Sequence, residues 1–288
     1  MISRTSELGS IGRSEQGVPY NAKDFERISQ FLHSTAGIRL DEANERMVYA
    51  RLAARVQQLG FPSFAAYIDM ATSPKNSEER DRLISALTTN TTHFYRESHH
   101  FDYLSETVLP ELVARARAGE RIRIWSAGCS TGEEAYSIAI CLLAAFPDAA
   151  SHDIKILATD IDREALERAK AANYAPAGLR SLAKAILDQR FDAISSNGHR
   201  TPKPAVKSLV TFRQLNLMSD WPFSGQFDVI FCRNVAIYMD ALTQERIWTR
   251  FQQVMRPSAH LFIGHSERLS ASLKSSFALV GKTIYRHI

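Results

Sequence analysis

The spacing of hydrophobic positions along the chain changes once, near Gly119. From residue 21 to residue 118 apolar side chains recur every three or four positions, which is typical of amphipathic helices. The polar stretch NTTHFYRE, at 90–97, interrupts this pattern. We therefore expect an all-helical N-terminal domain over residues 21–89, with helix starts and stops marked by capping residues and glycines.

After Gly119, short apolar runs alternate with helical patterns, which is typical of βαβ units and of a parallel sheet covered on both faces. The expected strands are RIRIWSA (121–127), IKILAT (154–159), LVTFRQL (209–215), FDVIFC (227–232) and HLFIG (260–264). Helical patterns lie between most of them, at 131–146, 162–172 and 241–255. Residues 90–288 are therefore predicted to form an α/β domain.

Three segments fall outside this alternation. Residues 174–207 hold a helical piece followed by the turn-forming string SSNGHRTPKP, which predicts a small inserted hairpin subdomain. The last residues, SFALVGKTIYRHI, predict a hairpin with Gly281 at its turn. Residues 1–20 are polar and lack the apolar core of a signal peptide, so we expect a disordered leader there.

Composition narrows the class of protein. With 45% hydrophobic and 23% charged residues among 288, the chain has the make-up of a soluble globular protein. The longest apolar run, Ile138–Phe146, is far shorter than the roughly 20 residues that span a bilayer, so no membrane insertion is expected. Three scattered cysteines without metal-binding spacing indicate reduced thiols, no metal site and a cytoplasmic protein. The net charge of +4 permits an acidic partner without requiring nucleic acid.

The loop WSAGCSTGEE, which leaves the first strand, suggests a ligand without phosphate. Its glycines are only Gly128 and Gly132, so the dinucleotide fingerprint G-x-G-x-x-G is absent. A pyrophosphate at the following helix would also face Glu133 and Glu134, and like charges there oppose binding. The alternative is that both glutamates merely occupy the first turn of a helix, where its dipole favours acids.

The second strand ends at Asp160, the place where an acid binds ribose hydroxyls in nucleotide-binding sheets. Together with the loop, this favours an adenosine ligand that carries positive charge, as S-adenosylmethionine does. Other polar residues stand at expected strand exits and junctions, where each alone could be a turn, cap or core residue. They are Asn90, Thr92, Arg96, Asn216, Arg233, Asn234 and Tyr238.

In combination these strings resemble the CheR-type chemotaxis receptor methyltransferases. The shared strings are LTTNTTHFYRE, WSAGCSTGEEAYSIAI, ILATDID, IFCRNVAIYMD and FIGHSE, in the family's order from about Asp24 to the C-terminus. The resemblance implies a helical N-terminal domain and a Rossmann-like, class I S-adenosylmethionine-dependent methyltransferase domain with a small inserted β-subdomain at 174–207.

The resemblance also implies the site residues. It places the cofactor contacts on Asn90, Thr92, Arg96, Glu134, Asp160, Asn216, Leu217, Arg233 and Asn234. It puts Arg96 and Tyr238 near the transferred methyl group as the catalytic residues, and it leaves Glu133 as a helix-start residue.

The activity implied is transfer of a methyl group to receptor glutamates, giving glutamyl methyl esters and S-adenosylhomocysteine. The expected partners are the acidic cytoplasmic helices of methyl-accepting chemotaxis receptors, bound by a monomer. Arg51 and Arg55 flank the apolar stripe of the second helix and are candidates to meet those acids; the alternative is a solvated helix flank. Because ISSNGHRTPKPAV is shorter than in members that bind a tethering peptide, tethering is not expected.

Three rival functions fit less well. A nucleic-acid N-methyltransferase commonly needs prolines and an aromatic clamp after the fourth strand, and CRNVAIY has neither. A dinucleotide-dependent oxidoreductase is disfavoured by the loop after the first strand. A non-catalytic receptor-binding scaffold with a vestigial pocket is disfavoured because the implied ligand residues are all present.

Overall fold

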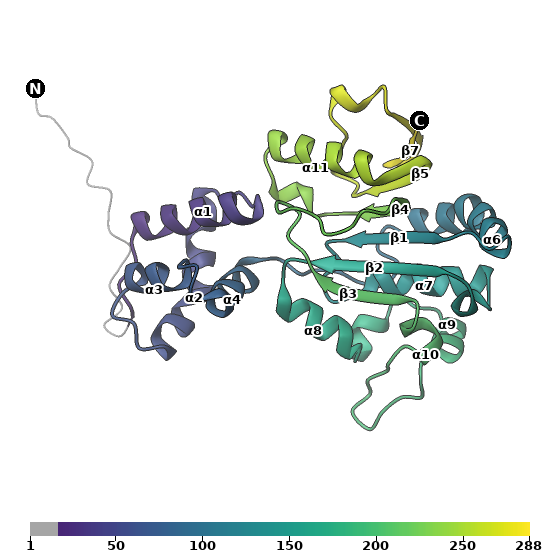
Figure 1. The fold of residues 1–288 in the computed structure, drawn as a ribbon. Coiled ribbons are helices and arrows are strands. Elements are labelled where there is room, and N and C mark those ends of the chain that lie inside the picture. Colours follow the sequence, from purple (N-terminus) through teal and green to yellow (C-terminus); the bar gives the residue numbers. More distant parts are fainter. Residues whose placement is uncertain (1–16) are drawn as a thin grey trace, which may run out of the picture. The chain divides into compact units, whose positions relative to one another are not determined.

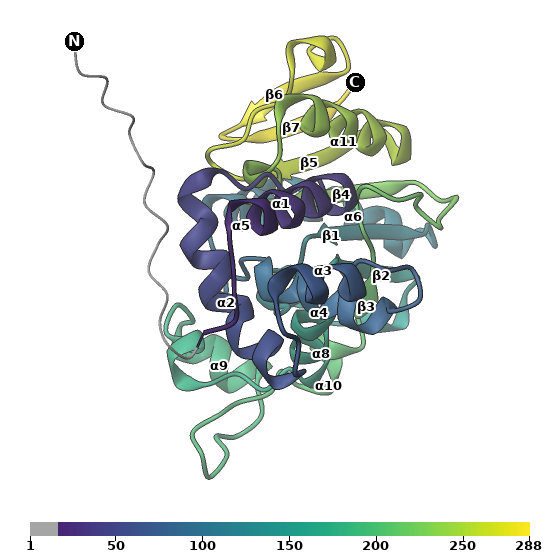
Figure 2. The same ribbon diagram turned by 90° about the vertical axis from the view of Figure 1, so that its left-hand side faces the viewer.

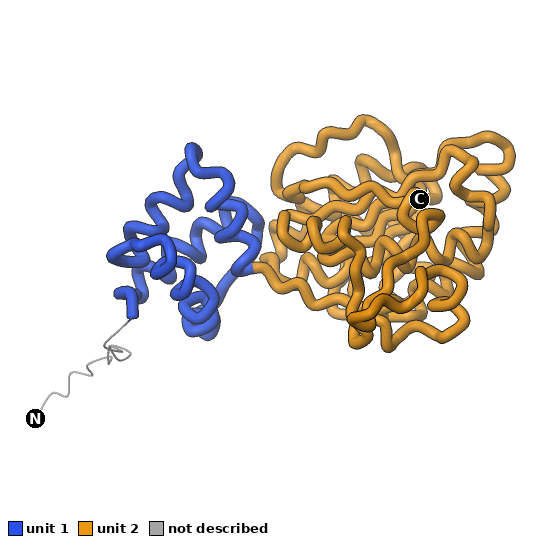
Figure 3. The backbone as a smooth tube through the Cα atoms, turned by 90° about the horizontal axis from the view of Figure 1, so that it is seen from below, with its two compact units in different colours: residues 1–87 blue, residues 88–288 orange. Residues whose placement is uncertain are grey.

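The computed structural model describes residues 17–288, so residues 1–16 of the expected leader lie outside the described residues. The chain divides into two compact units, one ending at Leu87 and the other running from Thr88 to Ile288 (Figure 3). In the described part of the chain, none of the helices combines the length and the apolar character needed to cross a membrane.

The first unit is built from helices. Its first helix begins at a capping box, in which the side chains of Asn21 and Asp24 each accept from the other residue's backbone N–H. The helix ends at Gly37, whose φ of 71° is the left-handed conformation that glycine adopts without strain. The helices are α1 (Ala22–Ala36), α2 (Glu45–Gln58), α3 (Phe64–Ala71) and α4 (Ser77–Leu87), with a 3₁₀ turn at Glu42–Asn44.

The second unit contains a seven-stranded sheet in the order β3-β2-β1-β4-β5-β7-β6 (Figure 1). The first five strands are parallel, whereas β7 is antiparallel to β5 and to β6. Figure 2 shows the β6–β7 hairpin beside β5 and α11. The strands are β1 (Ile122–Ala127), β2 (Ile154–Asp160), β3 (Val210–Gln214), β4 (Phe227–Cys232), β5 (Met255–Ile263), β6 (Phe277–Gly281) and β7 (Ile284–His287).

Helices bury both faces of this sheet. Successive residues of β4 alternate between two hydrophobic clusters: Val229 and Phe231 belong to one, and Ile230 and Cys232 to the other. A strand buried on both sides needs apolar residues at nearly every position, which explains the run FDVIFC. The helices are α5 (His99–Tyr103), α6 (Leu109–Arg117), α7 (Glu133–Ala145), α8 (Arg163–Ala171), α9 (Lys184–Arg190), α10 (Pro204–Lys207) and α11 (Ala241–Val254).

The direction of winding reverses between β1 and β4. Helices α7 and α8, which follow β1 and β2, pack into the first cluster, whereas α11, which follows β4, packs into the second. Neighbouring parallel strands whose connections leave to opposite faces open a crevice at their carboxyl ends, where such sheets bind ligands. The fold therefore places the candidate site at the ends of β1, β2 and β4.

The segment 174–207 differs from the expected β-subdomain. It contains α9, α10 and a 3₁₀ turn, and its only β pairing consists of two isolated bridges, Tyr174–Arg200 and Phe191–Pro202. A continued ladder is opposed by Pro202 and Pro204, which have no backbone N–H to donate. The strand β5 also begins earlier than expected, at Met255, while the C-terminal hairpin is confirmed.

Candidate cofactor site at the strand ends

The loop after β1 is held in a tight turn by two glycines. Gly128 and Gly132 have φ values of 83° and 94°, a region that L side chains rarely adopt. A Cβ on Gly128 would lie 2.2 Å from Cγ2 of Val235, in the loop that follows β4. A Cβ on Gly132 would lie 3.0 Å from Cβ of Ala169 in α8. The glycines therefore permit close approach of neighbouring elements to the loop.

Asp160 ties this loop to the end of β2. Its Oδ2 accepts from the backbone N–H of Ser130 at 2.7 Å, and its Oδ1 accepts from that of Asp162 at 2.9 Å. Burial raises its pKa to about 6. A carboxylate has about four acceptor sites. Its backbone donors, Ser130, Asp162 and Ile161, do not use all four, so Asp160 keeps the capacity to accept from a hydroxyl group of a ribose.

Asp162 is a buried residue that the sequence analysis did not single out. It caps α8 by accepting from the N–H of Ala165 at 3.0 Å, as an aspartate before a helix predicts. Its other oxygen accepts from Thr88 Oγ1 at 2.9 Å and from Asn90 Nδ2 at 2.5 Å. The cap could be read from the sequence, but the contact with Asn90, far away in the chain, could not. Asp162 thereby fixes the amide of one expected cofactor contact.

Glu134 and Arg233 form a buried ion pair. Arg233 Nε donates to Glu134 Oε2 at 2.7 Å, Ser126 Oγ donates to Glu134 Oε1 at 2.7 Å, and the two charged side chains are 2% and 9% exposed. The negative charge of Glu134 is thus balanced within the protein. Repulsion of a phosphate by Glu134 is therefore weaker than the sequence alone suggests.

Glu133 lies in the first turn of α7, next to Glu134. Its Oε2 accepts from Thr131 Oγ1 at 2.6 Å, and burial raises its pKa. The two glutamates are therefore not equivalent: one is paired with an arginine, and the other accepts a hydroxyl from its own loop.

The guanidinium of Arg233 reaches further residues. Its Nη1 donates to the backbone oxygen of Arg96 and to Nδ1 of His100, at 3.1 Å from the latter. His100 is fully buried, and its pKa falls to about 3 because of burial and then because of Arg233. The neutral ring accepts at Nδ1 and donates from Nε2 towards the oxygen of Lys282 at 3.1 Å. Arg233 thus links α7 to the Arg96 loop.

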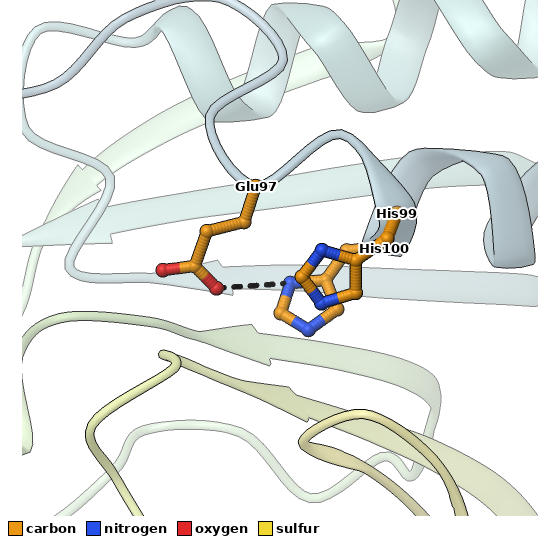
Figure 4. A group of neighbouring side chains, drawn as sticks. All are labelled: Glu97, His99 and His100. Atoms are coloured by element: carbon orange, nitrogen blue, oxygen red, sulfur yellow. Dashed lines mark ion pairs between the residues drawn. The ribbon is translucent and has the colours of Figure 1, made fainter.

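Glu97, His99 and His100 gather their ligand-type atoms within 4.8 Å of one another (Figure 4). Within this group, Glu97 Oε2 lies 3.5 Å from Nδ1 of His100. The same Nδ1 accepts from Arg233, so a permanent cation stands where a metal ion would have to bind. Repulsion between the two cations disfavours this cluster as a metal site.

Asn234 adopts the left-handed conformation, with φ 59°. Its Nδ2 donates to Glu97 Oε1 at 3.3 Å, which brings Asn234 close to the loop of Arg96.

Arg96 Nη1 donates to the backbone oxygen of Thr91 at 2.8 Å, and Thr92 is half-buried in the same loop. Tyr238 follows on the 3₁₀ turn Ala236–Tyr238 and is 37% exposed.

Asn216 and Leu217 follow β3. The N–H of Leu215 donates to the oxygen of Asp160 at 3.0 Å, so the exit of β3 runs beside the end of β2. Asn216 Oδ1 accepts from the N–H of Met218 at 2.9 Å, and Leu217 is buried. Of the expected cofactor contacts, Asp160, Asn216, Leu217, Arg233 and Asn234 thus lie at or just after the carboxyl ends of β2, β3 and β4, and Glu134 lies in the first turn of α7. Asn90 contacts Asp162 after β2, and the backbone of Arg96 contacts Arg233 after β4.

Arg51 and Arg55 lie in α2 of the first unit. Arg55 makes two hydrogen bonds to Glu79, Nε to Oε1 at 3.0 Å and Nη2 to Oε2 at 2.5 Å. Tyr67 donates to the same carboxylate at 3.1 Å. Arg51 is exposed and donates to the oxygen of Ala86 at 3.4 Å. Arg55 thus has a structural role inside its unit, and Arg51 lies at the surface of that unit.

Comparison with known proteins identifies the family. Residues 23–88 match the family described as "CheR methyltransferase, all-alpha domain", and residues 90–286 match "CheR methyltransferase, SAM binding domain". A probable chemotaxis protein methyltransferase from Rhizobium etli is 46% identical over 258 residues, covering 89% of this chain and 96% of the relative. Chemotaxis protein methyltransferases from Salmonella typhimurium and Escherichia coli are 42% and 40% identical, each over 91% of this chain and over 88% and 89% of their own lengths. The chain belongs to the CheR methyltransferase family, with an all-alpha domain followed by a methyltransferase domain that binds S-adenosylmethionine.

Proposed function

We propose that this chain transfers a methyl group from S-adenosylmethionine to glutamate side chains of methyl-accepting chemotaxis receptors, giving glutamyl methyl esters. The observation that carries the proposal is the pair of buried carboxylates, Asp160 and Glu134, at the ligand end of the sheet. One is free to accept from ribose hydroxyls, and the other is held beside the loop by Arg233. The relatives named chemotaxis protein methyltransferases support the choice of receptor as substrate.

The proposed cofactor contacts are those that the family resemblance implies, and this arrangement supports two of them. Asp160 accepts from the ribose. The hydrogen bonds of Ser126 and Arg233 to Glu134 hold the loop after β1 next to the loop after β4. A phosphate ligand is disfavoured because Arg233 is committed to Glu134 and Asp160 stands at the loop. The full set is Asn90, Thr92, Arg96, Glu134, Asp160, Asn216, Leu217, Arg233 and Asn234.

The chemistry proposed needs no general base. A glutamate has a pKa of about 4.3 and is ionised at neutral pH, so its oxygen attacks without losing a proton. S-adenosylmethionine supplies an electrophilic methyl group, and the new oxygen–carbon bond forms as the sulfur–carbon bond breaks, with the electron pair left on sulfur. Arg96 and Tyr238 orient the carboxylate by hydrogen bonds, and the site excludes water from it. The products are the methyl ester and S-adenosylhomocysteine.

The proposed partners are acidic cytoplasmic helices of the receptors, met by a monomeric, cytoplasmic enzyme. Arg51 and Arg55 are the two basic candidates in α2: Arg51 is exposed, and Arg55 is hydrogen-bonded to Glu79. We propose that the helical domain, 21–89, contributes to receptor binding and that 90–288 carries the chemistry.

A methyl-transfer assay tests the proposal. Purified protein, methyl-labelled S-adenosylmethionine and a receptor cytoplasmic fragment are incubated, and the product is treated with mild alkali. A carboxyl ester releases labelled methanol, whereas an N-methyl group on protein or nucleic acid does not. The fragment with its candidate glutamates changed to alanine is the control. Absence of alkali-labile label on all receptors tried would refute the substrate.

A further inference from the structure

The string FIGHSE contains a buried carboxylate to which the proposed reaction gives no role. Glu267 follows β5 and is 2% exposed. It accepts from four backbone N–H groups: one from Gly264 in its own loop, and three from consecutive residues of the loop that leaves β4. These three are Asn234 and Val235, each at 3.1 Å, and Ala236 at 2.8 Å. Glu267 therefore joins the exit of β5 to the exit of β4.

The shape of the β4 exit loop depends on this carboxylate. Consecutive N–H groups converge on one anion only where the backbone curves around it, and Asn234 begins the curve with φ 59°. Asparagine tolerates this conformation better than most residues, at some cost in free energy. A carboxylate supplies only acceptors, whereas a glutamine amide would turn an NH₂ group towards backbone donors. Charge and not only size is thus required at position 267.

The absence of a side chain at Gly264 leaves room for the contact between Glu267 and Asn234. A Cβ at that position would lie 2.7 Å from Asn234 Nδ2 and 2.8 Å from both Asn234 N and Glu267 Oε2. On its other side Asn234 donates from Nδ2 to Glu97 Oε1 at 3.3 Å. Two carboxylates therefore hold Asn234, one by its main chain and one by its side chain.

The residues on either side of this contact belong to the proposed site. Arg233, directly before Asn234, pairs with Glu134, and Tyr238 stands on the turn that Ala236 begins. We propose that Glu267 is a positioning residue: through the backbone of residues 234–236 it sets the place of Asn234 for cofactor binding and of Tyr238 for methyl transfer. The inference rests on the proposed function for the roles of Asn234 and Tyr238.

Asp228, near the start of β4, provides a matched control for Glu267, which contacts the loop that follows β4. Asp228 is also buried, accepts from the backbone N–H of Arg123 at 2.8 Å and from Arg115 Nη2 at 2.8 Å, and lies at the amino end of β4, away from the loops. Loss of either carboxylate costs folding stability, because buried donors lose their partner. Only loss of Glu267 alters the loop at the site.

The test compares Glu267→Gln with Asp228→Asn in the full chain. Binding of S-adenosylhomocysteine is measured by calorimetry at a temperature where thermal unfolding shows that both variants are folded. Glu267→Gln should bind at least about 10-fold more weakly than the wild type, and Asp228→Asn should bind with wild-type affinity. Turnover with saturating S-adenosylmethionine should also fall for Glu267→Gln. Glu267→Asp should recover part of both losses, because it restores the anion.

Gly264→Ala is a second variant that keeps the carboxylate and displaces Asn234, and it covers the case in which Glu267→Gln does not fold. It should also weaken S-adenosylhomocysteine binding. The inference is overturned if Gly264→Ala, or a folded Glu267→Gln, binds with wild-type affinity, or if Asp228→Asn weakens binding equally. Since this binding needs no receptor, failure to methylate receptors would refute the proposed substrate without affecting this result.

Discussion

Each unit holds an arginine–glutamate pair, the partly buried Arg55–Glu79 in the first and the buried Arg233–Glu134 in the second, and the two are built differently. Arg55 and Glu79 face each other with two parallel hydrogen bonds, and the further donor on that carboxylate, Tyr67, belongs to the same helical unit. Arg233 donates a single hydrogen bond to Glu134, and its Nη1 donates to His100 and to the backbone oxygen of Arg96. The partners described for the first pair lie in the first unit, and the second pair is the centre of a network.

The difference shows that pairing by itself does not indicate function. A bidentate pair among helices stabilises the packing of those helices, since removing one partner leaves a buried charge. Such a pair needs no further role to explain its geometry. A pair whose remaining donors go to the loops at the ends of parallel strands fixes the relative position of those loops. We therefore assign a structural role to the first pair and a site-organising role to the second.

The largest effect should follow from opening the second pair. Glu134→Gln leaves Arg233 buried without its counter-charge, which should cost about 3–5 kcal/mol of unfolding free energy for the methyltransferase domain. Binding of S-adenosylmethionine and methyl transfer should both be lost to the limit of detection. Urea unfolding and calorimetry measure the two effects. Near-normal cofactor affinity in a folded Glu134→Gln protein would remove this pair from the site.

The matched change in the first pair should separate stability from binding. Glu79→Gln should destabilise the helical domain by about 2–3 kcal/mol, less than in the previous case because Arg55 is partly exposed and can rehydrate. The affinity for S-adenosylmethionine should not change. Domain-resolved hydrogen exchange together with calorimetry tests this, and a weakened cofactor affinity would contradict the division of roles.

Asp160 is a buried carboxylate that is hydrogen-bonded by backbone N–H groups, in contrast to the two glutamates, which bind arginines. The hydrogen bond from Arg55 holds the pKa of Glu79 below its ordinary value, whereas burial raises that of Asp160 to about 6. The raised value means that ionised Asp160 costs folding free energy, a cost that appears as the pH rises from about 4 towards 6. Glu79 acts in the opposite direction: its contribution is present at neutral pH and is lost on acidification below its ordinary pKa.

A pH dependence of binding follows. Ribose hydroxyls donate best to the ionised form of Asp160, so the affinity for S-adenosylmethionine should fall as the pH drops below about 6, by up to 10-fold per pH unit. In Asp160→Asn the affinity should be about 10-fold or more weaker at neutral pH, and this part of the pH dependence should disappear. Calorimetry between pH 5 and 8 gives both results, and an unchanged profile in Asp160→Asn would exclude the residue as the titrating group.

The sequence predicts the frame of the site better than its internal contacts. The strands β1, β2 and β4 are buried on both faces, so continuous apolar runs mark them to within a residue. The start of β5 was missed because MRPSA contains Pro257 and polar residues. Asp160 is predicted as a site residue from its place at a strand end. The partners of Arg233 and Glu267 are far away in the chain, and no local pattern records which distant donor or acceptor a buried charge will meet.

Tyr238 should give the smallest effect. Its side chain is 37% exposed and lies outside both ion pairs, so Tyr238→Phe should leave stability and cofactor affinity unchanged. If the hydroxyl orients the attacking carboxylate, turnover should fall by about 10-fold, the worth of one hydrogen bond to a charged group. Steady-state kinetics at saturating cofactor measures it. Equal turnover in the two proteins would leave Arg96 as the orienting residue by itself.

The central claim, methyl transfer to a glutamate oxygen at the site that Arg233 organises, is tested most directly by peptide mass spectrometry of a methylated receptor fragment. The account predicts one methyl increment on glutamate-bearing peptides, removed by mild alkali, absent when those glutamates are changed to alanine, and absent with the Glu134→Gln enzyme. Methylation that survives alkali, persists on the alanine-substituted fragment, or proceeds normally with Glu134→Gln would contradict it.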